Sequence, residues 1–207
     1  MLAVDVSGSV DREEYRIQMQ GLADGLRDGT VSEALVAGKA ALTVIHWTGT
    51  SRQVVAVPWA RIDSFEAVEA FASSVETAPR AWRNFSTAIG EALVFALAQF
   101  QAVPDCRLRI IDVSGDGSSN EGVDPSTVHG RLHAAKVTVN ALVIEGAEPD
   151  MTGYYWENVI IGAGAFVITA NSYAEYPDRM RRKLQREVAK QLSQGQSDND
   201  TDVRTIQ

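Results

Sequence analysis

Segments typical of buried β-strands alternate with segments typical of amphipathic helices along this 207-residue chain. The clearest strands are residues 107–113, R-L-R-I-I-D-V, and residues 136–144, K-V-T-V-N-A-L-V-I. Apolar residues follow a helical spacing over residues 11–27, ahead of Gly29. This alternation within a chain of one-domain length predicts an α/β fold, a doubly wound, mostly parallel open sheet with helices on both faces.

The sheet is expected to have one antiparallel edge strand. Residues 40–47 and 53–57 are rich in β-forming side chains and are separated by T-G-T-S-R, which predicts a hairpin whose second strand ends at Pro58. A first and a last strand are expected over residues 1–4 and 165–169. Further helices are expected over residues 64–74, 86–100, 124–134, 152–161 and 172–192.

The predicted domain covers residues 1–192. Residues 193–207 are rich in Gln, Ser and Asp, and we expect them to form a disordered tail. Only four residues precede Asp5, which is short for a central strand, so we expect that an upstream segment is missing. Such a segment is where a signal peptide would lie, and none is present in this chain.

Composition excludes several classes of function. The net charge is −8, with 27 acidic and 19 basic side chains, and this field repels nucleic acid and anionic lipid. No run reaches the roughly 18 apolar residues that cross a bilayer. The single Cys106 excludes an internal disulfide framework and a multi-cysteine metal site.

The pentapeptide D-V-S-G-S follows the first strand. Asp5, Ser7 and Ser9 alternate at the strand end, so their side chains are expected to converge at the carboxyl edge of the sheet. One carboxylate and two hydroxyls suit Mg²⁺, Mn²⁺ or Ca²⁺ and do not suit zinc. Ser and Asp also cap helices, and Asp11 with Glu14 has the spacing of a capping box. By itself the pentapeptide fits a cap as well as a metal site.

Two further pieces complete a recognisable pattern. Together with D-V-S-G-S, the Thr87 of F-S-T-A-I-G-E-A-L and the Asp116 of I-D-V-S-G-D-G resemble the metal-ion-dependent adhesion site of von Willebrand factor type A domains, which have a Rossmann-like fold. Residues 154–167, Y-Y-W-E-N-V-I-I-G-A-G-A-F-V, and the following R-R-K-L-Q-R-E resemble one bacterial family of small, often secreted, single-domain proteins of this type. The function of that family is uncharacterised.

This resemblance implies a divalent cation, Mg²⁺ first and Mn²⁺ or Ca²⁺ as alternatives. Ser7 and Ser9 would bind it through their hydroxyls, Thr87 directly or through water, and Asp5 and Asp116 largely through water. Two carboxylates balance the +2 charge and the other ligands are neutral, so the cation stays electrophilic toward a further oxygen.

The expected partner is a protein with an exposed Asp or Glu, and the oligomeric state is left open. The resemblance also implies an extracytoplasmic location and a last helix, residues 172–192, that shifts when ligand binds.

The loop before Thr87 departs from the family pattern, in which it is often glycine-rich. Here it carries Trp82, Arg83, Asn84 and Phe85. Trp82 and Arg83 fit a rim that contacts the partner, and they fit equally a Trp packed on the domain with a solvated Arg. Asn120 and Glu121 are interpreted as loop residues in preference to a site rim.

Two other functions are carried as alternatives. The first is a metal-assisted hydrolase or phosphotransferase. Such an enzyme commonly has a second carboxylate two residues after the first, and here Ser7 stands at that position, so catalysis is the weaker interpretation. A cytoplasmic adaptor of a chaperone-like ATPase is the other.

His129 and His133 have zinc-like spacing, but residue 130 is Gly where the metalloprotease motif has Glu, so they are interpreted as surface or packing residues. The basic run of the last helix, which includes Lys183, is interpreted as a solvated face.

Overall fold

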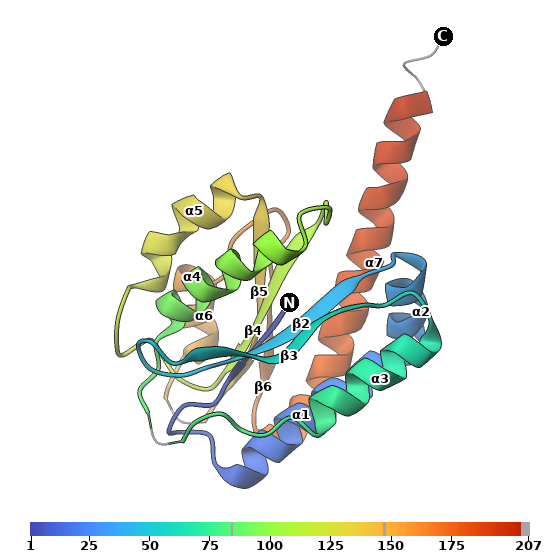
Figure 1. Ribbon diagram of the computed structural model, residues 1–207. Helices are drawn as coiled ribbons and strands as arrows, with labels where there is room; N and C mark the ends of the chain where they lie inside the picture. Colours follow the sequence, from blue (N-terminus) through green and yellow to red (C-terminus); the bar gives the residue numbers. More distant parts are fainter. Residues whose placement is uncertain (84, 147, 204–207) are drawn as a thin grey trace.

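Six strands form one sheet in the order β3-β2-β1-β4-β5-β6 (Figure 1). The computed structural model describes residues 1–83, 85–146 and 148–203, and side chains through Ala189. All neighbouring strands run parallel except β3, which pairs antiparallel with β2 at the edge. This confirms the predicted sheet. The strands are β1 (Leu2–Asp5), β2 (Ala41–Trp47), β3 (Gln53–Arg61), β4 (Arg109–Gly115), β5 (Val137–Ile144) and β6 (Val167–Ala170).

Helices cover both faces of the sheet (Figure 1). One face packs against α1 (Arg12–Arg27), α2 (Gly29–Ala37), α3 (Phe65–Glu76) and α7 (Tyr176–Val203). The opposite face packs against α4 (Ile89–Gln99), α5 (His129–Ala134) and α6 (Met151–Asn158). Short 3₁₀ turns are η1 (Phe100–Ala102), η2 (Pro125–Val128) and η3 (Tyr173–Glu175).

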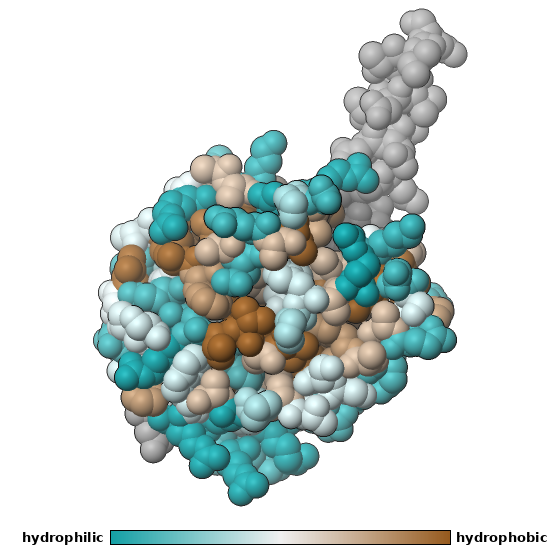
Figure 2. All heavy atoms as spheres, in the orientation of Figure 1, coloured by the Kyte–Doolittle hydropathy of each residue, from teal (hydrophilic) through white to brown (hydrophobic). Residues whose placement is uncertain are grey.

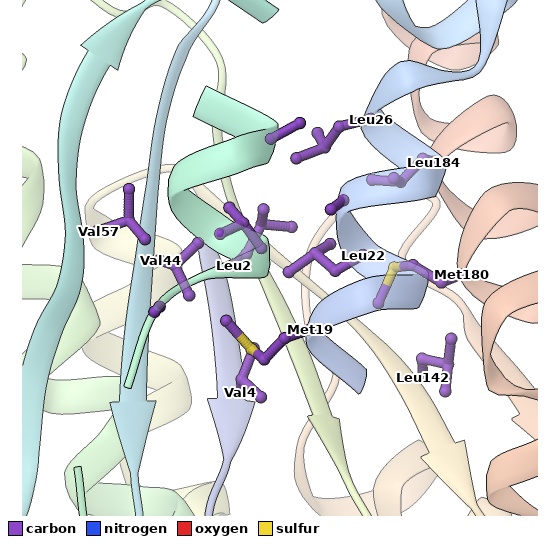
Figure 3. Close-up of a cluster of buried hydrophobic side chains, with 14 of the residues drawn as sticks. Leu2, Val4, Met19, Leu22, Leu26, Val44, Val57, Leu142, Met180 and Leu184 are labelled. Atoms are coloured by element: carbon purple, nitrogen blue, oxygen red, sulfur yellow. The ribbon is translucent and has the colours of Figure 1, made fainter. Parts of the chain in front are cut away.

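Two hydrophobic cores result, one on each face, and β1 contributes to both because its side chains alternate. Leu2 and Val4 point into the core that α1 and α7 cover, where Figure 3 shows them beside Met19 and Leu22. Ala3 points into the opposite core. With every residue of β1 buried, the end of this strand is held rigidly, and that end positions the candidate site.

The start of α1 decides between the helix-cap and the metal-site interpretation of D-V-S-G-S. Asp11 caps the helix, because its Oδ1 accepts a hydrogen bond from the Glu14 amide at 2.8 Å, and the Glu14 Oε2 accepts one from the Asp11 amide at 2.6 Å. The predicted capping box is therefore confirmed. Since Asp11 performs this role, the side chains of Asp5, Ser7 and Ser9 are not used to cap α1.

Several predicted boundaries were wrong. β3 continues through Pro58 to Arg61, since an edge strand tolerates a missing donor and the ladder is already irregular there. The helix expected from residue 86 begins at Ile89, and α2 was not expected at all. The last helix runs past residue 192 to Val203, while residues 204–207 of the expected tail lie outside the described residues. The division of the chain at residue 192 stays a prediction.

The solvated-face interpretation of the basic run on α7 was wrong for Lys183. This side chain has no exposed surface, and its Nζ donates to Asp112 of β4 and, at 2.9 Å, to Glu187. Lys183 lies on the stripe of α7 that faces the sheet, with Met180, Leu184 and Val188. Asn140 of β5 also donates to Glu187, at 2.7 Å, so the charges are buried as one hydrogen-bonded cluster.

The surface seen in Figure 2 is mixed. Hydrophobic residues show near its centre, over the sheet edge that β3 forms, and hydrophilic residues dominate its lower end, where α1 starts in Figure 1. Within the part of the chain that the structure describes, no helix combines the length and apolar character needed to span a membrane.

Candidate metal centre

The structure brings the predicted oxygens of β1 and β4 together at the carboxyl edge of the sheet. The Ser7 amide donates to Asp5 Oδ1 at 2.7 Å, which folds the loop back over the strand end. The Oγ atoms of Ser7 and Ser9 are 3.2 Å apart, and Ser9 Oγ donates to Asp116 Oδ1 at 2.6 Å. Asp116 follows β4, the parallel neighbour of β1, so the sheet topology itself places these side chains side by side.

Thr87 reaches the same place from the loop before α4, and its side chain is buried. Asn120 holds its backbone on both sides. The Thr87 amide donates to Asn120 Oδ1 at 2.9 Å, and the Asn120 amide donates to the Thr87 carbonyl at 2.9 Å. The hydroxyl faces Gly117, next to Asp116, where an added Cβ would lie 3.7 Å from Thr87 Oγ1. Asn120 is therefore a positioning residue, which the interpretation as a loop polar residue missed.

Another hydrogen bond fixes the Thr87 loop against the β1 loop. The Gly8 amide donates to the Phe85 carbonyl at 2.8 Å. From the other side, Thr48 Oγ1 donates to the Ser86 carbonyl at 2.8 Å. The five predicted site residues thus come from three loops that are bonded to one another.

Two carboxylates lie in this site without a cationic partner. Asp5 has no exposed surface and Asp116 is 4% exposed, and neither takes part in an ion pair among the described residues. Asp5 Oδ2 is buried without a hydrogen-bond partner. Burial, together with the neighbouring Asp116 charge, raises the pKa of the Asp5 carboxyl to about 7. The site therefore holds two carboxylates that form no ion pair, and an unused carboxylate oxygen.

Two tyrosine side chains, one from α6 and one from the segment before α7, close the site. Tyr155 of α6 is fully buried, and its hydroxyl donates to the Gly117 carbonyl at 3.2 Å. Only glycine fits at Gly115 without rearrangement, because a Cβ there would come within 2.5 Å of Tyr155 Oη and 3.1 Å of Asp5 Oδ2. Tyr173, in η3 just before α7, donates to Asp116 Oδ2 at 2.8 Å.

The donor set fits a hard divalent cation. It offers two carboxylates and three hydroxyls, with no sulfur or imidazole, and this is the chemistry that Mg²⁺, Mn²⁺ and Ca²⁺ select. A +2 charge would compensate the Asp5 and Asp116 pair, and Asp5 Oδ2 is free to accept a hydrogen bond from a coordinated water. The three histidines lie elsewhere, His46 in β2 and His129 and His133 in α5.

The loop before Thr87 gives a different rim from the one considered in the sequence. Trp82 is half-buried and packs against the core under α1, while Arg83 is exposed, as the packed interpretation describes. Asn84 lies outside the described residues. Phe85 is 38% exposed, and the Arg52 guanidinium stacks over its ring at 3.9 Å. Glu121 accepts from the Thr50 amide at 3.2 Å and so fastens the β2–β3 hairpin.

Comparison with solved structures identifies the fold. Proximal thread matrix protein 1 from the mussel byssus matches with 20% identity and a TM-score of 0.68 over 88% of this chain and 46% of its own. A second structure of that protein has a zinc-occupied MIDAS motif. A von Willebrand factor type A protein from Catenulispora acidiphila matches with 18% identity and a TM-score of 0.61, over 89% of this chain and 41% of its own.

Manganese-loaded Plasmodium vivax TRAP protein matches with 16% identity and a TM-score of 0.54, over 86% and 70% of the two chains. This chain spans about half the length of the mussel relative. No curated protein matches in sequence. The fold is that of a von Willebrand factor type A domain, as its resemblance implied, and a family model covers residues 1–192, so the chain belongs to the family described as protein of unknown function, DUF1194.

Proposed function

We propose that this protein is a metal-ion-dependent binding module that captures an acidic side chain of a partner protein. The observation that carries the proposal is the buried pair Asp5 and Asp116, which lies beside the Ser7 and Ser9 hydroxyls and forms no ion pair among the described residues. Neutral ligands between two carboxylates leave a divalent cation electrophilic, which suits capture of a carboxylate.

Each residue of the site has a role in the proposal. Ser7, Ser9 and Thr87 would ligate the cation through their hydroxyls, and Asp5 and Asp116 would balance its charge largely through water. When bound, the cation supplies an electrophilic position for a carboxylate oxygen of the partner. The chain itself holds these oxygens in place through the hydrogen bonds from Asn120, Gly8 and Tyr173.

Mg²⁺ is the proposed cation, with Mn²⁺ and Ca²⁺ as alternatives. The zinc in the mussel MIDAS motif and the manganese in the Plasmodium protein support a divalent cation in general.

A location outside the cytoplasm is also proposed, supported by the mussel byssus protein and by a pilus adhesin of the same fold from Lactobacillus rhamnosus. No observation favours the hydrolase or the ATPase adaptor over this function.

Calorimetry with Mg²⁺ tests the metal site. We expect wild type to bind one ion and Asp116→Asn and Thr87→Val to lose binding, with circular dichroism unchanged. Asp63→Asn is the matched control, because this exposed carboxylate follows β3 at the opposite edge of the sheet. Equal binding by Asp116→Asn and wild type would refute the proposed centre.

A displayed random-peptide library tests the partner class. Peptides selected in Mg²⁺ and eluted with EDTA are expected to contain an Asp or Glu whose replacement by Asn or Gln abolishes binding. Peptides that stay bound in EDTA, or that bind Asp116→Asn equally well, would contradict capture through the cation.

A further inference from the structure

Arg80 lies on the outer side of the loop that carries Ser7 and Ser9. Its Nη2 donates to the carbonyls of Val6 at 3.0 Å and Ser7 at 2.9 Å, and its Nη1 donates to the Asp11 carbonyl at 3.2 Å. One planar guanidinium thus holds the loop at both ends, from Val6 at the end of β1 to the cap of α1. The contact joins segments about 70 residues apart in the sequence.

Arg80 interacts with the charge of Asp5 through space only. Arg80 forms no ion pair among the described residues, and its Nε is buried without an acceptor. A surface arginine with a purely electrostatic role would face an acid in so acidic a protein. Here the planar guanidinium donates to three backbone carbonyls instead, so its donor geometry, and not its charge alone, determines the contact.

These bonds constrain the side of the loop that faces away from the candidate centre. With their carbonyls held outward by Arg80, Val6 and Ser7 leave the inner side of the loop to the Ser7 amide and the hydroxyls of Ser7 and Ser9. The Ser7 carbonyl also accepts from the Val10 amide at 3.2 Å, so Arg80 strengthens a turn that is already closed. Protein contacts thus hold the loop in its site-forming shape.

We propose that Arg80 is a positioning residue that preorganises the Asp5–Ser9 loop for cation binding, an inference that deepens the proposed function and rests on it. Groups that orient metal ligands from behind typically change metal affinity by about 10–100-fold when removed. Charge acts in the opposite direction, because a guanidinium near the centre repels a cation. The two effects can therefore be separated by substitution.

The test measures Mg²⁺ affinity by calorimetry in wild type, Arg80→Lys and Arg80→Met. Lysine keeps the charge and loses the planar fork, whereas methionine loses both. Positioning predicts that both variants bind Mg²⁺ more weakly, Arg80→Met by at least about 10-fold. Arg27→Met is the control, since Arg27 lies in the last turn of α1, at the end away from this loop, and pairs with Glu69 and Glu76, and we expect wild-type affinity. Unchanged affinity in Arg80→Lys with tighter binding in Arg80→Met would overturn positioning in favour of charge.

A second measurement needs no metal. Hydrogen exchange of the Gly8 and Val10 amides, which donate to Phe85 and Ser7, reports the order of the loop. We expect exchange at both amides to accelerate at least about 10-fold in Arg80→Met, while core amides of β5 stay unchanged. Faster exchange confined to residues 77–83 would mean that Arg80 only fastens its own loop. If wild type fails to bind Mg²⁺, the proposed function falls, and this exchange result still decides whether Arg80 holds the loop.

Discussion

Replacing Lys183 by Met removes the cation of the buried cluster on α7. Two carboxylates would remain, Asp112 and Glu187, each 6% exposed. Breaking a buried pair by removal of one partner costs about 3–5 kcal/mol, since the other charge stays desolvated. We expect a loss of this size in the free energy of unfolding, measured by urea denaturation at pH 8 with circular dichroism.

The pH dependence of this loss follows from the carboxyls. Burial and the adjacent Asp112 raise the pKa of Glu187 to about 8, above that of an unfolded glutamate, so the folded state binds more protons between about pH 4.5 and 8. Stability from this proton is present at low pH and is lost as the pH rises through 8. In the absence of Lys183, protonation of Glu187 becomes more favourable still. The loss in the free energy of unfolding caused by Lys183→Met is therefore expected to be smaller at pH 5.5 than at pH 8.

A neighbouring residue provides the control. Arg182 is one position away on α7, is 59% exposed and pairs with Asp178, so Arg182→Met should cost less than about 1 kcal/mol. Neutralising the whole cluster, with Asp112→Asn and Glu187→Gln added to Lys183→Met, should recover most of the loss. A penalty below about 1 kcal/mol for Lys183→Met, or one equal at both pH values, would refute the reasoning.

Three further predictions concern the site and its surroundings. Gly115→Ala should destabilise the fold by at least about 2 kcal/mol, and adding Tyr155→Phe, which removes the clashing Oη, should recover part of this in a double-mutant cycle of urea unfolding. Burial lowers the pKa of His46 to about 4, so the folded state binds fewer protons and stability should fall by about 3 kcal/mol from about pH 6.5 through 4, a slope that His46→Gln should remove. Asp11→Ala should cost about 1 kcal/mol by loss of the capping box, and an unchanged thermal midpoint would contradict this.

The sheet was predictable because its signals are local. Buried strands of a parallel sheet are continuous apolar runs, and each helix on them has an apolar stripe. The missed helix α2 also had a signal in the sequence, because Asp28 is a typical N-cap residue. In the structure its Oδ1 accepts from the amides of Thr30 and Val31, but Gly29 was interpreted only as the end of α1. The late start of α4 had none, because Thr48 and Asn120 hold residues 86–87 extended from distant parts of the chain.

The grouping of the five candidate residues was predictable, and the contacts that hold them in place were not. Asp5, Ser7, Ser9, Thr87 and Asp116 form a recurrent pattern, whereas Arg80, Asn120 and Tyr173 act across 33 to 74 residues of sequence and belong to no motif. Lys183 shows the same limit. Its position four residues before Glu187 and next to Leu184 places it on the apolar stripe, but only the tertiary partner Asp112 explains how the charge is accommodated.

Two contacts, one just before α7 and one within it, bear on the expectation that the last helix moves when ligand binds. Tyr173 donates to Asp116 at the candidate centre, and Lys183 donates to Asp112, four residues earlier, in β4. Sliding α7 by one turn, about 5.4 Å, would separate Lys183 from Asp112 at the cost worked out above. Release of Tyr173 would leave that buried cluster intact. Any movement is therefore expected to pivot about Lys183.

Distances between spin labels test the pivot. In a Cys106→Ser background, one label replaces Glu66 on α3 and the other replaces either Ala174 or Arg182, all three exposed. Mg²⁺ with a selected acidic peptide should change the distance to position 174, next to Tyr173, and leave the distance to position 182 unchanged. Equal shifts at both positions would mean that α7 slides as a unit, and the buried cluster would then have to exchange partners at a lower cost than its desolvated carboxylates imply.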